Sequence, residues 1–593
     1  MFRLSHIVSS TRSRNALTRL SGSSIPPSAR LIHAPARSQL RFISTSKVAL
    51  KIAPKVVPKV AGPISSQVGS KTVNKHSKLY RYVVRPVVVS LCVGGTIYLI
   101  DSYAYSSLLT RSVRALYILL WIAYAYGTNK EDNPEELHEV ASESLLQLLI
   151  ANKGLYIKIG QAIANQGNIF PLAYQKRFAQ LYDDAPVDSW ARVDAVLRNS
   201  LGSNYESEVF ESISHEPVAS ASIAQVHKAV LKDSKETVAV KVQHDYIQKQ
   251  VIVDLWVYRF TSKVYEKVFD IPLSYFTKYI SDQEIKETDF IHEMGNADKL
   301  TEIIKNDPTM KNVNVYIPKN YGKYTTKQVL VTEWIDGISL TDKDRLLDAG
   351  FDLTLIMQQY LNVFGKQMFK YGLVHSDPHP GNLLSRFDSK GKQQLVILDH
   401  GLYVTLPESF CVEYCNLWRY LFSFNRKGIE DIAKNWGINS YEMFSTLVSL
   451  RPMSVDPRDS AELRDKTSFH SLFRDFLGDK TKFPLPFLFL TRTMRIIQNL
   501  NQSFGSPVNR INLLTKESVD ALLINKNSKL NFSDRFELFT IRVNLFFSNV
   551  IFLFIRFRQI IMGDRYGGKG VGLEDYIEIY MQNTAKTLGL DWA

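Results

Sequence analysis

The chain has 593 residues and a net charge of +14. That length accommodates a two-lobed domain with its own cores plus extensions. The positive charge is concentrated at one end, because residues 1–100 contain sixteen Lys and Arg and no acidic residue, whereas the remainder is nearly neutral. A neutral body argues against an extended basic surface that would bind nucleic acid.

Residues 1–50 predict a mitochondrial transit peptide, because they are rich in Arg and Ser and lack Asp and Glu. A disordered basic arm is the alternative. Residues 51–82 continue as a basic linker rich in Pro and Ser.

Residues 83–105 predict a single transmembrane helix. The apolar run Val87–Ile100 is shorter than the ~20 residues of a comfortable span, and extension to Tyr105 supplies the missing length. Arg81 and Arg85 make the N-terminal flank the more positive one. A matrix-directed leader followed by one span would anchor the protein in the mitochondrial inner membrane with its folded body in the intermembrane space.

A helical extension is predicted for residues 106–204. Its apolar run Ala115–Tyr126 indicates a buried or interfacial helix, because about a dozen residues are too few for a second span. Two spans would return the body to the matrix side. The extension also carries Lys158-Ile-Gly-Gln161, in which Lys158, judged from its neighbours alone, would be a solvated lysine.

A loop of small residues follows at Pro217–His227, with Ala and Ser where a phosphate-binding loop usually has glycines. Each Ala adds a Cβ and forbids most positive-φ conformations, so we expect a stiffer loop that still lets a nucleotide approach closely. The candidate nucleotide-binding residues are Ala219, Ser220, Ala221, Ser222, Ile223 and Ala224.

The next segment, Thr237–Gln243, predicts a strand that carries Lys241 where kinases keep the lysine that contacts the nucleotide phosphates. A surface lysine on an edge strand is the alternative.

Glu293, on a predicted helix, is the candidate ion-pair partner of Lys241. A solvated helix face is the alternative for Glu293. Other acidic side chains near this helix are Glu284, Glu287 and Glu302. Further on, Gln328–Gly337 predicts a buried strand and hinge, with Glu333 as a candidate nucleotide-binding residue.

Two short segments carry the most specific signal, His375-Ser-Asp-Pro-His-Pro-Gly-Asn382 and Leu398-Asp-His-Gly401. Protein kinases place one carboxylate near the attacking oxygen and use an Asn and a second carboxylate to hold Mg²⁺. Asp377 is therefore the candidate catalytic carboxylate, and Asn382 and Asp399 are the candidate metal ligands.

The order of these elements predicts an α+β, protein-kinase-like bilobal fold. Residues 205–337 would form a small β-rich N-lobe, and residues 338–593 a helical C-lobe with C-terminal helices. Within the latter, Val543–Ile561 would either lie on lipid as an amphipathic helix or pack against the C-lobe. Cys411 and Cys415 are expected to be buried thiols, and no His/Cys spacing predicts a structural metal.

The combined motifs resemble those of the UbiB family, the aarF-domain-containing atypical kinases. Lys158-Ile-Gly-Gln161 is similar to the family's K-x-G-Q motif, and Glu287-Thr-Asp289 to its E-x-D motif. The resemblance implies an enzyme that binds ATP and Mg²⁺ and whose extension covers the protein-substrate groove. It also implies that Lys158 and Gln161 approach Glu287 and Asp289, and that these four residues belong to the active site.

Asp399-His-Gly, where most members have Asp-Phe-Gly, resembles a mitochondrial branch associated with coenzyme Q and lipid homeostasis. We therefore expect an atypical kinase or ATPase with a lipid or quinone-like substrate, and a membrane protein complex as a candidate partner. A nucleotide-binding pseudokinase scaffold and a small-molecule phosphotransferase are the alternatives.

Overall fold

The computed structural model describes residues 80–561, except for residues 105, 129–133, 165–170, 183–186, 271, 440–443, 445–447, 449–477, 526–527 and 529. The predicted transit peptide and nearly all of the predicted linker lie outside the described residues.

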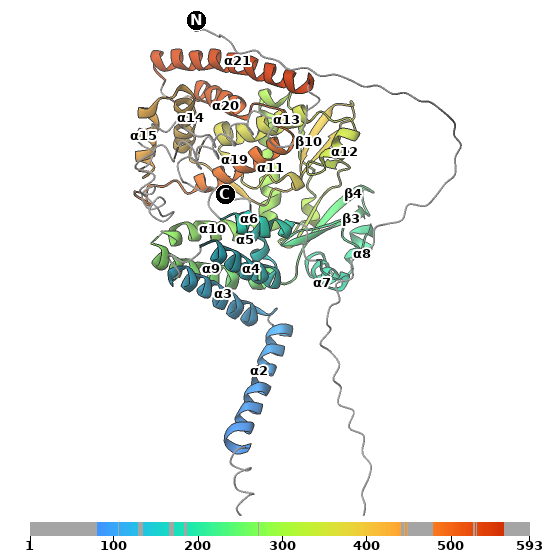
Figure 1. Ribbon diagram of the computed structural model, residues 1–593. Coiled ribbons are helices and arrows are strands. Elements are labelled where there is room, and N and C mark those ends of the chain that lie inside the picture. The colour runs from blue at the N-terminus through green and yellow to red at the C-terminus, as the bar shows by residue number, and fades with distance from the viewer. Residues whose placement is uncertain are drawn as a thin grey trace, which may run out of the picture. The chain divides into compact units, whose positions relative to one another are not determined.

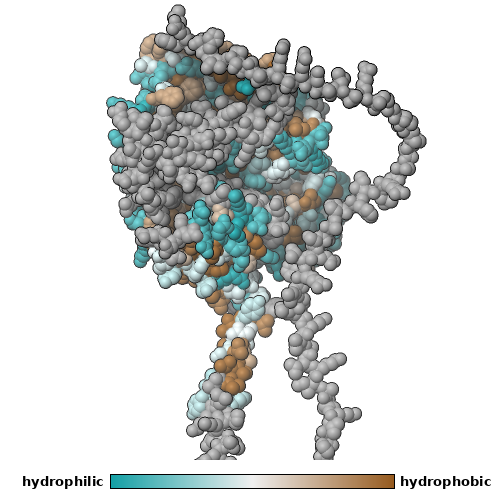
Figure 2. Space-filling model, in the orientation of Figure 1, coloured by the Kyte–Doolittle hydropathy of each residue, from teal (hydrophilic) through white to brown (hydrophobic). Residues whose placement is uncertain are grey.

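The described chain begins with a π-helical turn, Tyr80–Val84, followed by α2 (Arg85–Ala104) and α3 (Leu108–Thr128). Apolar side chains of α2 are exposed along its length, as Figure 2 shows. The Asp101 carboxylate receives hydrogen bonds from the N–H groups of Leu109 and Thr110, both at 2.8 Å. Asp101 thereby caps α3 and fixes the turn between the two helices.

A bundle of helices surrounds α3. It contains α4 (Pro134–Asn152), α5 (Leu155–Ala164), α6 (Leu172–Phe178), the 3₁₀ turn Ala179–Tyr182, α9 (Ile247–Phe269) and α10 (Leu273–Glu287). Figure 1 shows these helices grouped together beside the N-lobe sheet. Arg111 of α3 forms a buried ion pair with Asp254 of α9. A buried ion pair is costly to separate, so α3 is fixed to this bundle.

The N-lobe is built on an antiparallel sheet with the order β1-β3-β4-β6, and β2 pairs with β3. Its strands are β1 (Phe210–Ile213), β2 (Ala219–Ser220), β3 (Ala224–Leu231), β4 (Thr237–Gln243) and β6 (Val329–Glu333). Alternate residues of β4 are buried, as expected for a sheet with one covered face. The short helices α7 (Trp190–Leu201) and α8 (Tyr205–Glu208) precede the sheet, and α11 (Phe290–Asn306) follows α10.

The C-lobe combines two small sheets with helices. One sheet has the order β5-β10-β9-β7, and β8 pairs with β11 in the other. The strands are β5 (Val315–Tyr316), β7 (Ile338–Ser339), β8 (Leu373–His375), β9 (Leu383–Phe387), β10 (Gln393–Ile397) and β11 (Tyr403–Thr405). The helices are α12 (Lys343–Asp348), α13 (Leu353–Lys366), α14 (Glu408–Ser423), α15 (Arg426–Asn435), α19 (Pro486–Ser503), α20 (Arg510–Ile524) and α21 (Phe532–Ile561). Short 3₁₀ or π turns lie at Pro308–Met310, Gly322–Tyr324, Gln367–Tyr371 and Pro380–Asn382.

One large core holds the C-lobe together, with Tyr360, Phe364, Tyr414 and Trp418 almost fully buried in it. A separate core under the N-lobe sheet contains Val238, Val240 and Val242. Two cores in two lobes confirm the predicted protein-kinase-like α+β fold. Cys411 and Cys415 are free and buried in α14, as expected.

Candidate active site

The centre of the candidate site is a buried ion pair between the two elements that the sequence predicted to meet. Lys241 Nζ lies 2.8 and 2.9 Å from the two carboxylate oxygens of Glu293 and 3.1 Å from Asp399 Oδ2. Lys241 is a partly buried residue of β4, and Glu293 lies in the first turn of α11. The predicted contact between Lys241 and Glu293 is therefore present.

Burial and charge set the protonation of this cluster. Burial lowers the pKa of Lys241, but Asp399 and Glu293 outweigh burial and hold the pKa above its ordinary value. Burial raises the pKa of Asp399, but Lys241 and the Gly401 N–H outweigh it, so the pKa lies below its ordinary value. Lys241 and Asp399 are thus a stable cation and anion near neutral pH.

One N-cap defines the start of α11, and two contacts fix the helix at this position. Asp289 is the N-cap of α11, and its side chain accepts a hydrogen bond from Ile291 N at 3.0 Å. The amide of Asn296 donates to the carbonyl oxygen of His400 at 3.0 Å. The ring of Phe290 lies under Lys241, with Nζ 5.1 Å from the ring centroid. Because of these contacts, α11 is tied to both lobes.

The hairpin β9–β10 brings the candidate metal ligands together. Asn382 directly precedes β9 and Asp399 follows β10, and the pairing of Leu383 with Ile397 places both at the same end of the hairpin. Leu398 N donates to the backbone oxygen of Asn382 at 3.0 Å, which closes that end. The antiparallel register thus explains why an Asn and an Asp separated along the chain share one site.

Oxygen donors from Asn382 and Asp399 fit Mg²⁺, which proteins often hold through one or two side chains and the phosphates of a nucleotide. Among the residues that the structure describes, no group of three or more His, Cys, Asp and Glu side chains could hold a metal by itself. Asn382 and Asp399 would leave further coordination positions for nucleotide phosphates and water.

Asp377 follows β8, and its carboxylate has a partner that the sequence analysis missed. Arg492 Nη2 of α19 lies 2.9 Å from Asp377 Oδ2, and both side chains are partly shielded from solvent. The one signal in the sequence is an arginine in the mostly apolar start of a helix, Pro486–Thr493. No known motif spacing connects this arginine to Asp377.

The Ala/Ser loop forms the turn between β2 and β3. Ala221 N donates to Ala224 O at 2.8 Å, and none of the residues from 219 to 224 has a positive φ. His244 anchors the turn, because its N–H donates to Ile223 O at 3.0 Å and its imidazole lies 3.2 Å from Ala221 O. The other imidazole nitrogen lies 2.8 Å from Asp188 Oδ2. The loop needs no glycine in this conformation. The six candidates lie together here: Ala219, Ser220, Ala221, Ser222, Ile223 and Ala224.

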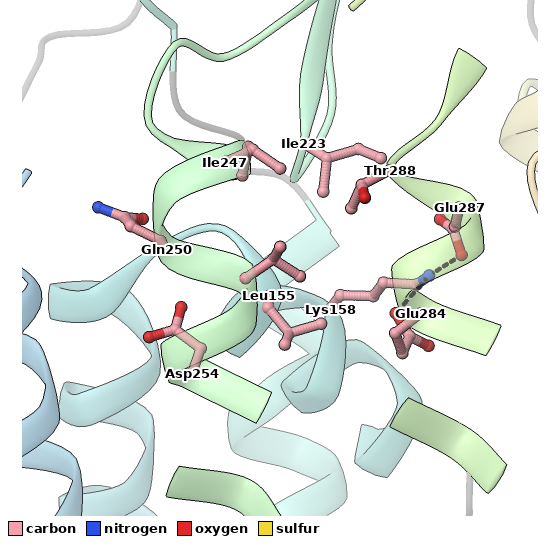
Figure 3. A pocket seen from close by; sticks show the side chains of 10 residues that line it. Leu155, Lys158, Ile223, Ile247, Gln250, Asp254, Glu284, Glu287 and Thr288 are labelled. Carbon is pink, nitrogen blue, oxygen red and sulfur yellow. Dashed lines mark hydrogen bonds and ion pairs between the residues drawn. The ribbon is translucent and has the colours of Figure 1, made fainter. Parts of the chain in front are cut away.

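Lys158 is the second buried cation of the site. It extends from α5 toward α10, where its Nζ contacts Glu287 and lies 2.9 Å from Glu284 Oε2 (Figure 3). Burial lowers the pKa of Lys158, but the two carboxylates and, to a smaller extent, Asp377 outweigh burial and raise it. A solvated Lys158 is therefore excluded.

In the described part of the chain Lys158 forms no ion pair with Asp289, so the expected contact between Lys158 and the E-x-D motif is present at Glu287 alone. Asp289 uses its carboxylate to cap α11, and Glu284, one turn before Glu287 on α10, is the second partner of Lys158. Residues three apart on a helix lie on one face, which is why Glu284 replaces Asp289. Gln161 donates to Leu181 O at 2.9 Å, so this amide contacts the turn that follows α6 within the extension.

Two glycines explain how the extension and the site fit together. A Cβ on Gly160 would lie 2.3 Å from Leu181 Cδ1 and 2.7 Å from Leu149 Cδ1, so only glycine lets α5 pack this closely. A Cβ on Gly401 would lie 3.0 Å from Glu287 Cγ. Glu287, held by Lys158, therefore packs directly on the segment that carries Asp399.

Glu333 ends β6 at the start of the connection between the lobes. Its N–H donates to Lys319 O at 2.9 Å, and its carboxylate accepts hydrogen bonds from Tyr316 Oη at 2.5 Å and Lys319 N at 3.2 Å. The side chain therefore stabilises the hinge region. A role of Glu333 in binding adenine stays a prediction.

The fold and this arrangement define a kinase-like protein, and comparisons with known proteins identify its family. The model described as the ABC1 atypical kinase-like domain matches residues 180–433. An ABC1 family protein of Purpureocillium lilacinum is 32% identical over 539 residues, which cover 83% of this chain and 89% of the relative. An ABC1 family protein of Schizosaccharomyces pombe is 38% identical over 436 residues, 71% of this chain and 81% of the relative.

Another relative, AarF domain-containing kinase 1 of Drosophila melanogaster, is 35% identical over a shorter match of 319 residues, 53% of this chain and 60% of the relative. The chain therefore belongs to the ABC1 family of atypical kinase-like proteins, which is the UbiB/AarF family that its motifs indicated.

Proposed function

We propose that this protein is an atypical kinase or ATPase that binds Mg²⁺-ATP. The observation that supports the proposal is the convergence of Lys241, Glu293 and Asp399, with Asn382 at the same end of the hairpin. Lys241 would contact the nucleotide phosphates, and Asn382 and Asp399 would hold Mg²⁺, which neutralises phosphate charge when bound. The turn at residues 219–224 would cover the phosphates.

Asp377 would orient the attacking hydroxyl group or water and accept its proton. Arg492 Nη2 lies 2.9 Å from Asp377 Oδ2 and would hold this carboxylate in position. Lys158, Glu284 and Glu287 bury a charged cluster beside the segment that carries Asp399. A site partly enclosed by the protein's own helices favours water or a small or lipid-derived substrate over a protein substrate.

We further propose that the protein acts at the mitochondrial inner membrane in coenzyme Q or membrane-lipid homeostasis. A basic leader without acidic residues and the exposed apolar surface of α2 support this location. A quinone-like or lipid substrate could reach the site by lateral diffusion in the membrane. A location at the inner membrane would also allow assembly with other membrane proteins.

A pair of substitutions tests the enzyme proposal in the full-length protein. Asp399→Asn should abolish most of the thermal shift caused by Mg²⁺-ATP, because an amide cannot neutralise the metal. Asp377→Asn should preserve that shift and lower ATP turnover by about 10²-fold. Asp348→Asn, at an exposed position in α12, is the matched control and should change neither. Binding without turnover in the unmodified protein would instead indicate a pseudokinase.

A further inference from the structure

The C-terminal helix α21 has two faces with different environments. Its inner face packs against α20 and α14, and Leu538, Ile541, Leu545 and Phe552 are buried there at intervals of three, four and seven residues. This spacing follows one side of an α-helix. Figure 1 shows α21 lying lengthwise along the outside of the C-lobe, next to α20.

Polar contacts fix α21 to the C-lobe at both ends. Arg419 of α14 lies 2.7 Å from Asp534 and also contacts Glu537. Near the other end, the buried Arg556 donates to Gly505 O at 3.3 Å. By length and composition α21 could cross a membrane, as could α2 and α3. Crossing would break these shielded polar contacts and expose the C-lobe core, so α21 stays on the C-lobe.

The outer face of α21 is apolar along the whole helix. Its exposed apolar residues include Phe546, which is 65% exposed, and Phe554, which is 72% exposed. Single exposed apolar residues are normal, whereas a continuous strip over thirty residues marks an interaction surface. The strip consists of Phe532, Phe536, Phe539, Val543, Phe546, Phe547, Val550, Ile551, Leu553, Phe554, Phe557, Ile560 and Ile561.

Charge indicates what this strip contacts. The sequence has no acidic residue from Leu538 to Ile561, and the two acidic residues before it, Asp534 and Glu537, are paired with Arg419. Arg535, Arg542 and Arg558 are exposed on the helix, and Arg542 is paired with Asp520 of α20. A long phenylalanine-rich strip with basic side chains matches the boundary between headgroups and acyl chains of an anionic bilayer.

We propose that the outer face of α21 docks on an anionic phospholipid surface, with the helix lying in the interface plane. This contact is separate from the predicted span at α2 and does not depend on nucleotide chemistry. α21 would hold one side of the C-lobe against lipid, so the orientation of the kinase-like body relative to that surface would be fixed.

The test measures the depth of single labels in the full-length protein. Cys92→Ser removes the exposed thiol, and the buried Cys411 and Cys415 remain. A cysteine introduced as Phe554→Cys carries an environment-sensitive fluorophore. The matched control is Phe424→Cys, at a residue that is 77% exposed after the end of α14. Each labelled protein is reconstituted into vesicles of phosphatidylcholine, with or without phosphatidylglycerol.

In anionic vesicles, brominated acyl chains should quench the label at position 554 severalfold more than the label at position 424. Aqueous iodide should quench the label at position 424 more than the label at position 554. Removal of phosphatidylglycerol should reduce the difference in bromolipid quenching between the two positions. Equal iodide quenching at both positions would show the strip in water and overturn the proposal. Protection of position 554 from both quenchers would show a protein partner, a second copy or another segment of this chain, and would also overturn it. Equal bromolipid quenching with and without anionic lipid would overturn the preference for anionic lipid.

Discussion

At the residue scale, the contact between Arg492 and Asp377 gives a specific prediction for chemistry. Arg492 Nη2 lies 2.9 Å from the carboxylate proposed to accept a proton, so Arg492 should position Asp377 without contacting the nucleotide. Arg492→Gln should lower ATP turnover by roughly tenfold or more, because a loosely held carboxylate is less often in position. Arg492→Lys should recover part of the rate, and the Mg²⁺-ATP thermal shift should stay unchanged in both variants.

The control for this prediction is the Asp377→Asn background. Arg492→Gln should cause little additional loss there, since the arginine acts through a carboxylate that is already absent. Independent losses that multiply in the double variant would show that Arg492 does not act through Asp377.

A second residue-scale prediction concerns the buried cation of the extension. Lys158 contacts Glu287 and lies 2.9 Å from Glu284, whereas Asp289 caps α11. A double-mutant cycle of Lys158→Ala with Glu287→Gln should give a coupling free energy of unfolding of about 1–3 kcal/mol. The matched cycle of Lys158→Ala with Asp289→Asn should be additive within about 0.5 kcal/mol. Denaturant unfolding of the full-length protein measures both coupling free energies. A larger coupling of Lys158 to Asp289 than to Glu287 would contradict the observed contacts.

The site residues that the sequence singled out by motif lie in short segments, and their catalytic and metal-binding roles stay predictions. Lys241, Asp377, Asn382 and Asp399 are marked by their immediate neighbours, and the structure brings Lys241 to Asp399 at 3.1 Å. Arg492 and Glu284 could not be predicted in this way, because their partners come from distant segments that only the packing of helices brings near. Lys158 was assigned to Glu287 and Asp289 because these two residues resemble the family's E-x-D motif, and a motif match does not show that Glu284 lies on the same helix face as Glu287.

At the scale of elements, the packing of α5 depends on the absence of one side chain. A Cβ on Gly160 would lie within 3 Å of the methyl groups of Leu149 and Leu181, both of which are buried. Gly160→Ala should therefore lower the free energy of unfolding by about 1–3 kcal/mol, because a packed core resists an added methyl group. Thermal unfolding measures the effect.

Gly295 in α11 provides the matched control. A Cβ there would meet nothing within 4 Å, so Gly295→Ala should be neutral or stabilise the helix by up to about 1 kcal/mol. Equal destabilisation by both substitutions would show that close packing of α5 is not the reason for Gly160.

Helices and strands differ in how clearly their sequences show which faces are buried and what covers them. The alternating residues of Thr237–Gln243 encode a half-buried strand directly, and the structure has that strand as β4. For Val543–Ile561 the sequence allowed either lipid contact or packing on the C-lobe, because hydrophobicity alone does not identify what covers a face. In the structure one side of α21 is packed on the C-lobe and the other is exposed, so packing is present on one face and lipid contact stays a prediction for the other.

At the scale of the whole molecule, the helices near the N-terminus bear on the proposed topology. By composition both α2 and α3 could span a membrane, but Arg111 of α3 is buried in an ion pair with Asp254. Separating that pair to insert α3 into lipid would leave a buried charge without its partner, at a cost of about 3–5 kcal/mol. This cost supports a single span at α2.

With one span and a positive N-terminal flank, the body of the protein should face the intermembrane space. Protease added to mitochondria with ruptured outer membranes and intact inner membranes should then digest the C-terminal body. A matrix protein, protected until the inner membrane is lysed, is the control for inner-membrane integrity. Protection of the C-terminal body in the same samples would show that it faces the matrix. In that case either α3 inserts as a second span despite its ion pair, or α2 does not cross the membrane.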